Sequence, residues 1–335
     1  MNRSSIIKII KYLASLIFAF GIIYMLFKNQ DPIKLINEIK KVEGKWIVLS
    51  MIFGAWAYVS RGLRWKIMLD AINYKSSNLN NIAAVSIGYF TNLFIPRAGE
   101  ISRCTALNQS DKIPINKLFG TIVVERVIDF IALLLLFLLT FAIKSNAIHQ
   151  FYLTIQGQKN TEKNYLIILI VIVGLIITIF TLKKILKKST LYEKILNFIE
   201  GLKEGFKSVQ KIKNKSSFWL HTLTIWLMYF LMTYICFFSM EETYNLTISD
   251  GVFLLVLGGI GMVIPTPGGI GSYHAIVMIG LSILGVGSVF LGEGGDPKNP
   301  ALIFPTIVHV AQTLVAIIMG LCSLLFLFLV KRKND

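Results

Sequence analysis

Charged side chains are scarce in this sequence of 335 residues. Asp, Glu, Lys and Arg together make up 16% of it, whereas hydrophobic residues make up 55%, and the mean hydropathy is +0.67. A soluble protein of this length needs a larger polar surface. No long hydrophilic segment is left for a soluble domain. We therefore predict an all-α polytopic membrane protein in which residues 1–335 form a single integral membrane domain.

Cysteines and enzyme motifs are also sparse. The three cysteines, Cys104, Cys236 and Cys322, lie far apart and without CxxC spacing. We expect them to pack as small residues, with no disulfide, metal site or cofactor. The chain has no GxxxxGK[ST], HExxH or DxD motif, so we expect no enzyme.

The sequence has few acidic residues to offset its lysines and arginines, and its formal net charge is +16. Ten lysines and three glutamates fall between Lys183 and Lys215, and this stretch lies between two apolar segments. It has no aromatic ladder for bases, so we expect no nucleic-acid partner. Under the positive-inside rule we predict a basic cytoplasmic loop at 183–217, which can rest on anionic headgroups.

Long apolar runs predict helices that cross the membrane, because a hydrocarbon core of about 30 Å needs about 20 helical residues. Two further regions are apolar but broken, one at "FIPRAGE" and one at "VIPTPGGIG". We predict six full spans plus two broken, re-entrant helical hairpins, about eight membrane segments in all. The spans are expected at about 6–27, 45–60, 119–143, 164–182, 218–240 and 301–330, and the hairpins at about 80–108 and 250–287.

The distribution of charge orients these segments. The basic loop and the tail Lys331-Arg332-Lys333 are predicted inside, and the acidic loops at 241–242 and 293–296 outside. Region 250–287 then starts and ends on one face, as does 80–108, and both termini are cytoplasmic. Residues 28–45 are predicted outside as an amphipathic interfacial helix. The alternative is that both broken regions cross fully, which would place the lysine loop outside.

The same order of segments occurs twice, in opposite orientation. The halves are about 6–143 and 164–330, joined by an outside loop at 144–163. Their breaks share Ile95-Pro96-x-x-Gly99 and Ile264-Pro265-x-x-Gly268. Inverted repeats with paired discontinuous helices are typical of secondary transporters, in which the binding site lies at the repeat interface.

The second break predicts part of that binding site. Irregular backbone at membrane depth is tolerated where protein or a watery cavity satisfies its polar groups. Proline stops the helix, and glycine lets the chain turn and a ligand approach it. The alternative is a tight turn between two short helices. The candidate residues are Pro265, Pro267, Gly268, Gly269, Gly271 and His274.

The first break carries charge. Arg97, Glu100 and Arg103 are three residues apart, which predicts one face of a helix restarting after Pro96. The arginine surplus suits phosphate. The alternative is a juxtamembrane cluster at the cytoplasmic face. Asn92 is expected to bond backbone carbonyls freed at this break.

Two more groups of charges lie in the predicted spans. Glu125, Arg126 and Asp129 are two turns into a span, which indicates a cavity, a buried ion network, or both. Arg61 and Arg64 end the second predicted span and are expected to act as topology signals and snorkelling anchors, with a secondary role at a headgroup.

Four stretches together resemble one family. "RGLRW", "GYFTNLFIPRAGEISR", "ERVIDFIALLL" and "PTPGGIGSYHAIVMIGL" have the order and spacing of the lysylphosphatidylglycerol synthase transmembrane region, a group of flippase-like integral membrane proteins. The resemblance spans roughly residues 6–330. It implies a bacterial inner-membrane protein and a headgroup pocket built from the two breaks and from Glu125, Arg126 and Asp129.

Two features distinguish the chain from the lipid-modifying relatives that the resemblance implies. Those relatives carry a soluble aminoacyl-transferase domain, whereas this sequence ends at Asp335, so lipid lysylation is not expected. Relatives often have a glutamate where this chain has His274, and that glutamate could pair with a cationic headgroup. Its absence favours an anionic, phosphate-bearing lipid or polyprenyl carrier.

The sequence thus predicts a lipid flippase whose partners are anionic membrane lipids. Two alternatives remain. One is a non-catalytic partner of another membrane protein, and the other is a membrane-embedded transferase that uses Glu125 and Asp129. A homo-oligomer is compatible with each of them.

Overall fold

The computed structural model describes residues 3–28, 32–155, 212–289 and 299–334, and these residues contain helices and no strand. The predicted span at 164–182 and most of the basic loop at 183–217 lie outside them. The helices are α1 (Arg3–Phe27), α2 (Pro32–Lys41), α3 (Gly44–Asp70), α4 (Asn78–Phe94), α5 (Gly99–Asp111), α6 (Ile115–Ile143), α7 (Ser145–Ile155), α10 (Lys215–Tyr234), α11 (Ile248–Val263), α12 (Ser272–Ile283) and α13 (Pro300–Asn334), with 3-10 turns η1 (Ile235–Ser239), η2 (Glu241–Thr243) and η3 (Pro267–Gly269).

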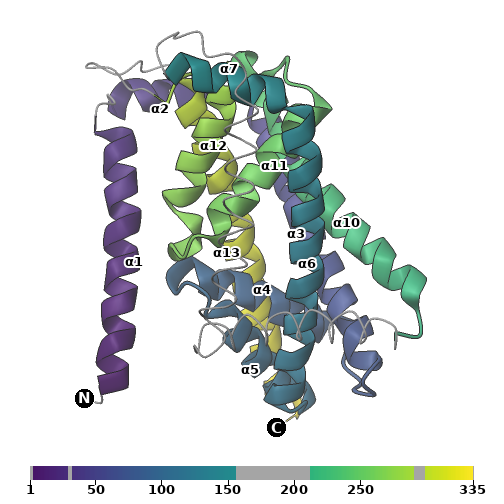
Figure 1. Cartoon of the computed structure of the whole chain (residues 1–335). Coiled ribbons are helices and arrows are strands. Elements are labelled where there is room, and N and C mark those ends of the chain that lie inside the picture. Colours follow the sequence, from purple (N-terminus) through teal and green to yellow (C-terminus); the bar gives the residue numbers. More distant parts are fainter. Residues whose placement is uncertain (1–2, 29–31, 156–211, 290–298, 335) are drawn as a thin grey trace, which may run out of the picture.

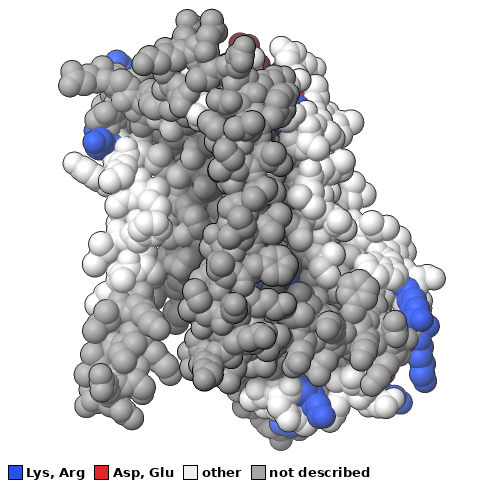
Figure 2. Space-filling view, in the orientation of Figure 1, with Lys and Arg blue, Asp and Glu red and all other residues white. Residues whose placement is uncertain are grey.

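Three helical stretches in the described part of the chain are long and apolar enough to cross a membrane. They are Gly44–Asp70, Lys215–Ser239 and Pro300–Leu329. Figure 2 shows lysines and arginines toward the upper and lower ends of the described surface, with a largely uncharged surface between them. Large apolar side chains are exposed there, such as Ile17, Phe20 and Leu223. The prediction of a helical membrane protein is confirmed, whereas the number of spans stays a prediction.

The first predicted hairpin consists of α4 and α5, which pack against each other. Ile95 ends α4 in an extended conformation (φ −122°, ψ 108°), as expected for a residue before proline. The side chain of Asn92 is expected from the sequence to bond a freed carbonyl, but its oxygen instead accepts a hydrogen bond of 2.7 Å from the N–H of Gly99, because the start of α5 leaves that N–H without a helical partner. A Cβ at Gly99 would collide with the carbonyl oxygen of Gly88 in α4. Glycine is therefore what lets the two helices approach.

The second predicted hairpin consists of α11 and α12, joined by η3. Ile264 is again extended before a proline. Gly268, Gly269 and Gly271 have φ values of 58°, 81° and 83°, a region that side chains with a Cβ rarely adopt. The Thr266 hydroxyl bonds that of Ser272 at 2.8 Å and closes the turn. The three glycines are therefore required by this backbone.

The two hairpins approach from opposite ends of the molecule, α4 and α5 from below and α11 and α12 from above in Figure 1. Their tips meet. A guanidinium nitrogen (Nη2) of Arg97 donates to the carbonyl of Val263 at 3.4 Å, and Gly268 lies against Leu93. α13 contacts α4, α12 and α3. α1 begins and α13 ends at the same lower end.

Two hydrophobic clusters hold the hairpins in place. One surrounds the second hairpin and includes the buried Phe237, Phe253 and Phe304. The other surrounds the first hairpin and includes Trp65 and Leu107. Each tip is therefore fixed by its own packed core rather than by the irregular segment itself.

Candidate functional site

A cavity of about 1030 Å³ lies where the two hairpin tips meet. Residues of α3, α4, α5, α6, α10, α11, α12 and α13 line it, together with both breaks. Its charged lining residues are Arg61, Arg97, Glu100, Arg126 and Asp129. Irregular backbone from both hairpins therefore faces one cavity, whose wall is mostly apolar but carries these charges, and freed N–H and C=O groups can be satisfied there.

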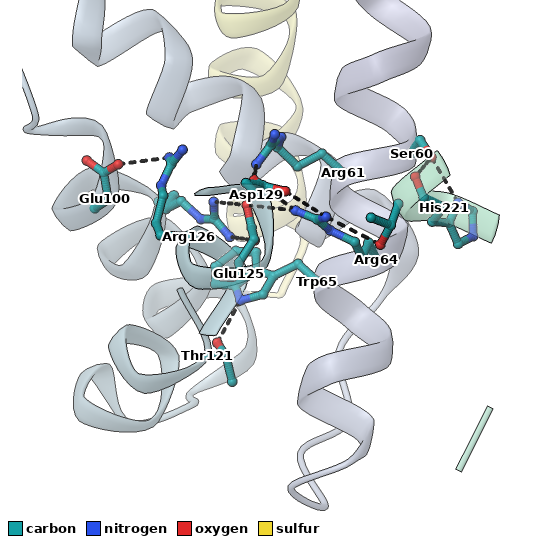
Figure 3. A network of polar contacts seen from close by, with 12 residues as sticks. Ser60, Arg61, Arg64, Trp65, Glu100, Thr121, Glu125, Arg126, Asp129 and His221 are labelled. Carbon is teal, nitrogen blue, oxygen red and sulfur yellow. Dashed lines mark hydrogen bonds and ion pairs between the residues drawn. The ribbon is translucent and has the colours of Figure 1, made fainter. Parts of the chain in front are cut away.

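A buried ion-pair network lies at this cavity and joins α3 to α6 (Figure 3). Arg61 Nη1 donates to Glu125 Oε1 at 2.6 Å and to Asp129 Oδ2 at 2.7 Å. Arg64, which is fully buried, reaches Asp129 Oδ1 at 2.9 Å. The arginines are three residues apart on α3 and the carboxylates four apart on α6, so each pair faces the other helix.

Arg103 of α5 completes the ion-pair network, which we define as Arg61, Arg64, Arg103, Glu125 and Asp129. Its Nη2 donates to Glu125 Oε2 at 2.8 Å. Its guanidinium carbon lies 4.0 Å from the ring centroid of Trp65, a cation–π contact. The network therefore links the first hairpin to both α3 and α6.

A second ion pair, Arg126 with Glu100, is more open to the cavity. Arg126 Nη2 donates to Glu100 Oε1 at 2.8 Å, and the two side chains are 46% and 24% exposed. Arg97 is also exposed, and it forms no ion pair within the described part of the chain. Arg97 and Arg126 are therefore the guanidinium groups most accessible to a ligand.

The structure places the predicted site residues in three groups. Asp129 and Arg61 belong both to the cavity wall and to the ion-pair network, whereas Arg64, Arg103 and Glu125 are buried behind the wall. Pro267, Gly271 and His274 do not line the cavity, and Gly271 instead packs against α1 at Ala19 and Ile22. The other predicted residues line it directly: Asn92, Arg97, Glu100, Arg126, Pro265, Gly268 and Gly269.

Two details differ from the sequence-based expectations. Arg61 and Arg64 do not snorkel to a membrane surface: they are 4% and 0% exposed. The physical reason is that α3 continues to Asp70, so both lie inside it and opposite the carboxylates of α6. Arg97 does not share a helix face with Glu100 and Arg103, because α5 begins at Gly99 and Arg97 has a left-handed backbone (φ 64°).

Three tyrosines at the cavity were missed by sequence reasoning. Tyr58 stacks on Tyr89 at a centroid distance of 4.2 Å, and the Tyr89 and Tyr229 hydroxyls bond at 2.9 Å. The guanidinium carbon of Arg61 lies 5.9 and 5.7 Å from the rings of Tyr89 and Tyr229. The sequence did contain a usable signal. A tyrosine in an apolar run carries its hydroxyl into the membrane, where that hydroxyl needs a hydrogen-bond partner, so such tyrosines indicate a polar site.

Two histidines lie beside the second break. His309 lines the cavity and stacks on Tyr273 at 5.2 Å, and its ring centroid is 4.9 Å from that of His274. Both are buried. His309 therefore belongs to the cavity wall, whereas His274 packs behind it.

Apolar helices, two opposed broken hairpins and a partly open cavity with three arginines in its wall are the features of an integral membrane protein with an internal charged site. The sequence model described as "Lysylphosphatidylglycerol synthase TM region" matches residues 12–320, and the chain belongs to that family. This confirms the family inferred from the four motifs.

Two curated relatives are archaeal. The chain is 25% identical to "UPF0104 membrane protein MJ1595" of Methanocaldococcus jannaschii over 356 aligned positions, covering 98% of each chain. It is 25% identical to "UPF0104 membrane protein PH1989" of Pyrococcus horikoshii over 264 positions, covering 70% of this chain and 76% of the relative. No solved structure matches significantly. The family supports a role connected with membrane lipids.

Proposed function

We propose that this protein moves an anionic, phosphate-bearing lipid or polyprenyl carrier between the two leaflets of a membrane. The observation that carries the proposal is the cavity of about 1030 Å³ at the meeting point of both hairpin tips, with Arg97 and Arg126 accessible in its wall. Arginine's planar fork matches the geometry of phosphate oxygens. A headgroup would enter the cavity while its chains stay in the bilayer.

The opposed hairpins suggest how access changes sides. If the two halves form an inverted repeat, rocking one half against the other opens the same site to either leaflet. Among the described residues, the polar contacts between the tips are weak, such as the 3.4 Å hydrogen bond from Arg97 to Val263. Little hydrogen-bond energy is therefore lost when the tips separate. No chemical conversion of the lipid is part of this proposal.

The proposed setting is a bacterial inner membrane, with both termini and the basic loop in the cytoplasm. The positive-inside rule supports this orientation, and α1 begins and α13 ends at the same end of the molecule. The two relatives named above come from archaea, so the bacterial setting is proposed from the family resemblance alone. Anionic lipids are the proposed partners, either of a single copy or of a homo-oligomer.

The direct test is lipid scrambling in liposomes that contain the purified protein and a phospholipid labelled on its acyl chain. A membrane-impermeant quencher bleaches only the outer leaflet, so active protein exposes the inner pool as well. Arg97→Ala and Arg126→Ala should each slow transfer at least about tenfold, which corresponds to about 1.4 kcal/mol of barrier. Both variants should elute in size-exclusion chromatography as the wild type does.

The matched control is Lys66→Gln, which removes one positive charge from α3 outside the cavity, where Lys66 pairs with Asp70. It should leave transfer unchanged. Unchanged transfer in both arginine variants would overturn the pocket assignment. A wild type that scrambles no lipid and purifies only with a stoichiometric protein partner would favour the partner function instead.

A further inference from the structure

We infer that the ligand of this cavity is a phosphomonoester, a phosphate held by a single ester bond, rather than a phosphodiester headgroup. A phosphomonoester carries a charge of about −1.5 to −2 at pH 7, whereas a diester carries a single charge. The inference rests on the proposed function and names its substrate class.

The first argument is the balance of charge. In formal charges, the wall contributes three arginines, Arg61, Arg97 and Arg126, against Glu100 and Asp129. Behind it, Arg64 and Arg103 face Glu125. Five arginines against three carboxylates leave a surplus of two positive charges. Arginine does not lose its proton in proteins, so this surplus persists at every physiological pH, and a ligand with two negative charges matches it.

The second argument is the distribution of free donors. Arg61 and Arg103 donate their terminal nitrogens to carboxylates of α6 in the ion-pair network, and their Nε atoms are buried. Arg97 contacts one carbonyl at 3.4 Å, and Arg126 bonds Glu100 through one nitrogen. Two guanidinium forks are thus open to a ligand. A monoester offers three unesterified oxygens to them, whereas a diester offers two.

The third argument concerns the source of the phosphate. Phe119, Val123 and Phe130 of α6 line the same cavity, and all three are large apolar residues exposed on that helix. Apolar walls beside a phosphate-binding group suit a hydrocarbon chain attached to it. We therefore assign the phosphomonoester to a membrane lipid, such as a diacylglycerol or a polyprenol carrying a terminal phosphate.

The experiment compares ligands that differ only in the ester. Protein in nanodiscs of neutral lipid is titrated with phosphatidic acid or with phosphatidylglycerol of the same acyl chains, and bound lipid is counted by native mass spectrometry. We expect phosphatidic acid to bind at least about tenfold more tightly at pH 8. The preference should shrink toward pH 5.5, because the monoester takes up its second proton near pH 6.

Three variants separate charge from structure. Arg97→Asn removes the charge with a residue that tolerates the left-handed backbone at φ 64°, and should abolish the preference. Arg97→Lys keeps the charge and should retain most of the preference. Lys66→Gln removes a charge outside the cavity and should have no effect.

The outcomes separate the two claims. Equal binding of both lipids, still weakened by Arg97→Asn, overturns the phosphomonoester inference and leaves lipid transport standing. No enrichment of either lipid overturns both. In a third arm, glycerol 3-phosphate that binds as tightly as phosphatidic acid retains the phosphomonoester but overturns the lipid as its source.

Discussion

Each carboxylate of the ion-pair network contacts more than one guanidinium group. Glu125 is fully buried and lies within 4 Å of Arg61, Arg64 and Arg103, and Asp129 within 4 Å of the first two. Breaking a buried ion pair by removing one partner leaves an uncompensated charge. At this scale, stability and function are coupled, because the network that holds three helices also shapes the wall of the cavity.

The first stability prediction concerns Glu125→Gln. The substitution keeps the shape of the side chain but removes the carboxylate partner of Arg103 and leaves Arg61 and Arg64 with Asp129 alone. We therefore expect a loss of about 3–5 kcal/mol of stability. The measurement is the thermal unfolding midpoint in detergent. Glu38→Gln is the matched control, because Glu38 pairs with an exposed Lys41 on α2, and its loss should cost under about 1 kcal/mol. Equal shifts in the two variants would refute the structural importance of the network.

At the scale of elements, the breaks depend on the packing of helices as much as on their own sequence. Gly99 lets α5 approach α4, and the glycines after Pro267 turn the chain between α11 and α12. At the first tip, glycine is needed because a Cβ would not fit between the helices. At the second tip, glycine is needed because the backbone has positive φ values.

A pair of alanine substitutions tests this distinction. Gly99→Ala places a Cβ against the carbonyl of Gly88 and the side chain of Asn92, and should destabilise by about 1–3 kcal/mol through overpacking. Gly120→Ala, in α6, meets no atom within 4 Å and should stabilise by about 0.5–1 kcal/mol, because glycine is unfavourable inside a helix. The measurement is the thermal unfolding midpoint of the two variants and the wild type under the same conditions. A neutral Gly99→Ala would contradict the close approach of α4 and α5.

At the scale of the whole molecule, the two hairpins enter from opposite ends. This arrangement matches re-entrant hairpins on opposite faces of a membrane and an inverted repeat. The first span of the second half falls outside the described residues, so the repeat stays a prediction. The orientation of the molecule in the membrane is likewise open to direct measurement.

Cysteine accessibility tests this topology. In a variant without the three native cysteines, single cysteines replace Lys75 and Lys112, which flank the first hairpin, or Glu242 and Ser288, which flank the second. A membrane-impermeant thiol reagent should label both members of a pair from the same side, and the two pairs from opposite sides. Labelling of 75 and 112 from opposite sides would show that the first broken region crosses fully.

The sequence by itself determined the class of the protein, its family, the two breaks and the charged residues of the cavity wall. Scarce charge and long apolar runs dictate a membrane protein, because hydrocarbon excludes unpaired polar groups. Proline followed by glycine within an apolar run predicts a break, and both breaks line the cavity. These are local rules, so a linear pattern contains enough information to apply them.

Only the tertiary structure decided which charges meet. Arg61 and Arg64 read as surface anchors until α3 is seen to continue to Asp70 and to face Glu125 and Asp129 across the molecule. Tyr229 likewise reaches the cavity only through the packing of α10 against α3. The physical reason is that a buried charge is tolerated through its partner, and partners more than sixty residues apart along the chain become neighbours only when the helices pack.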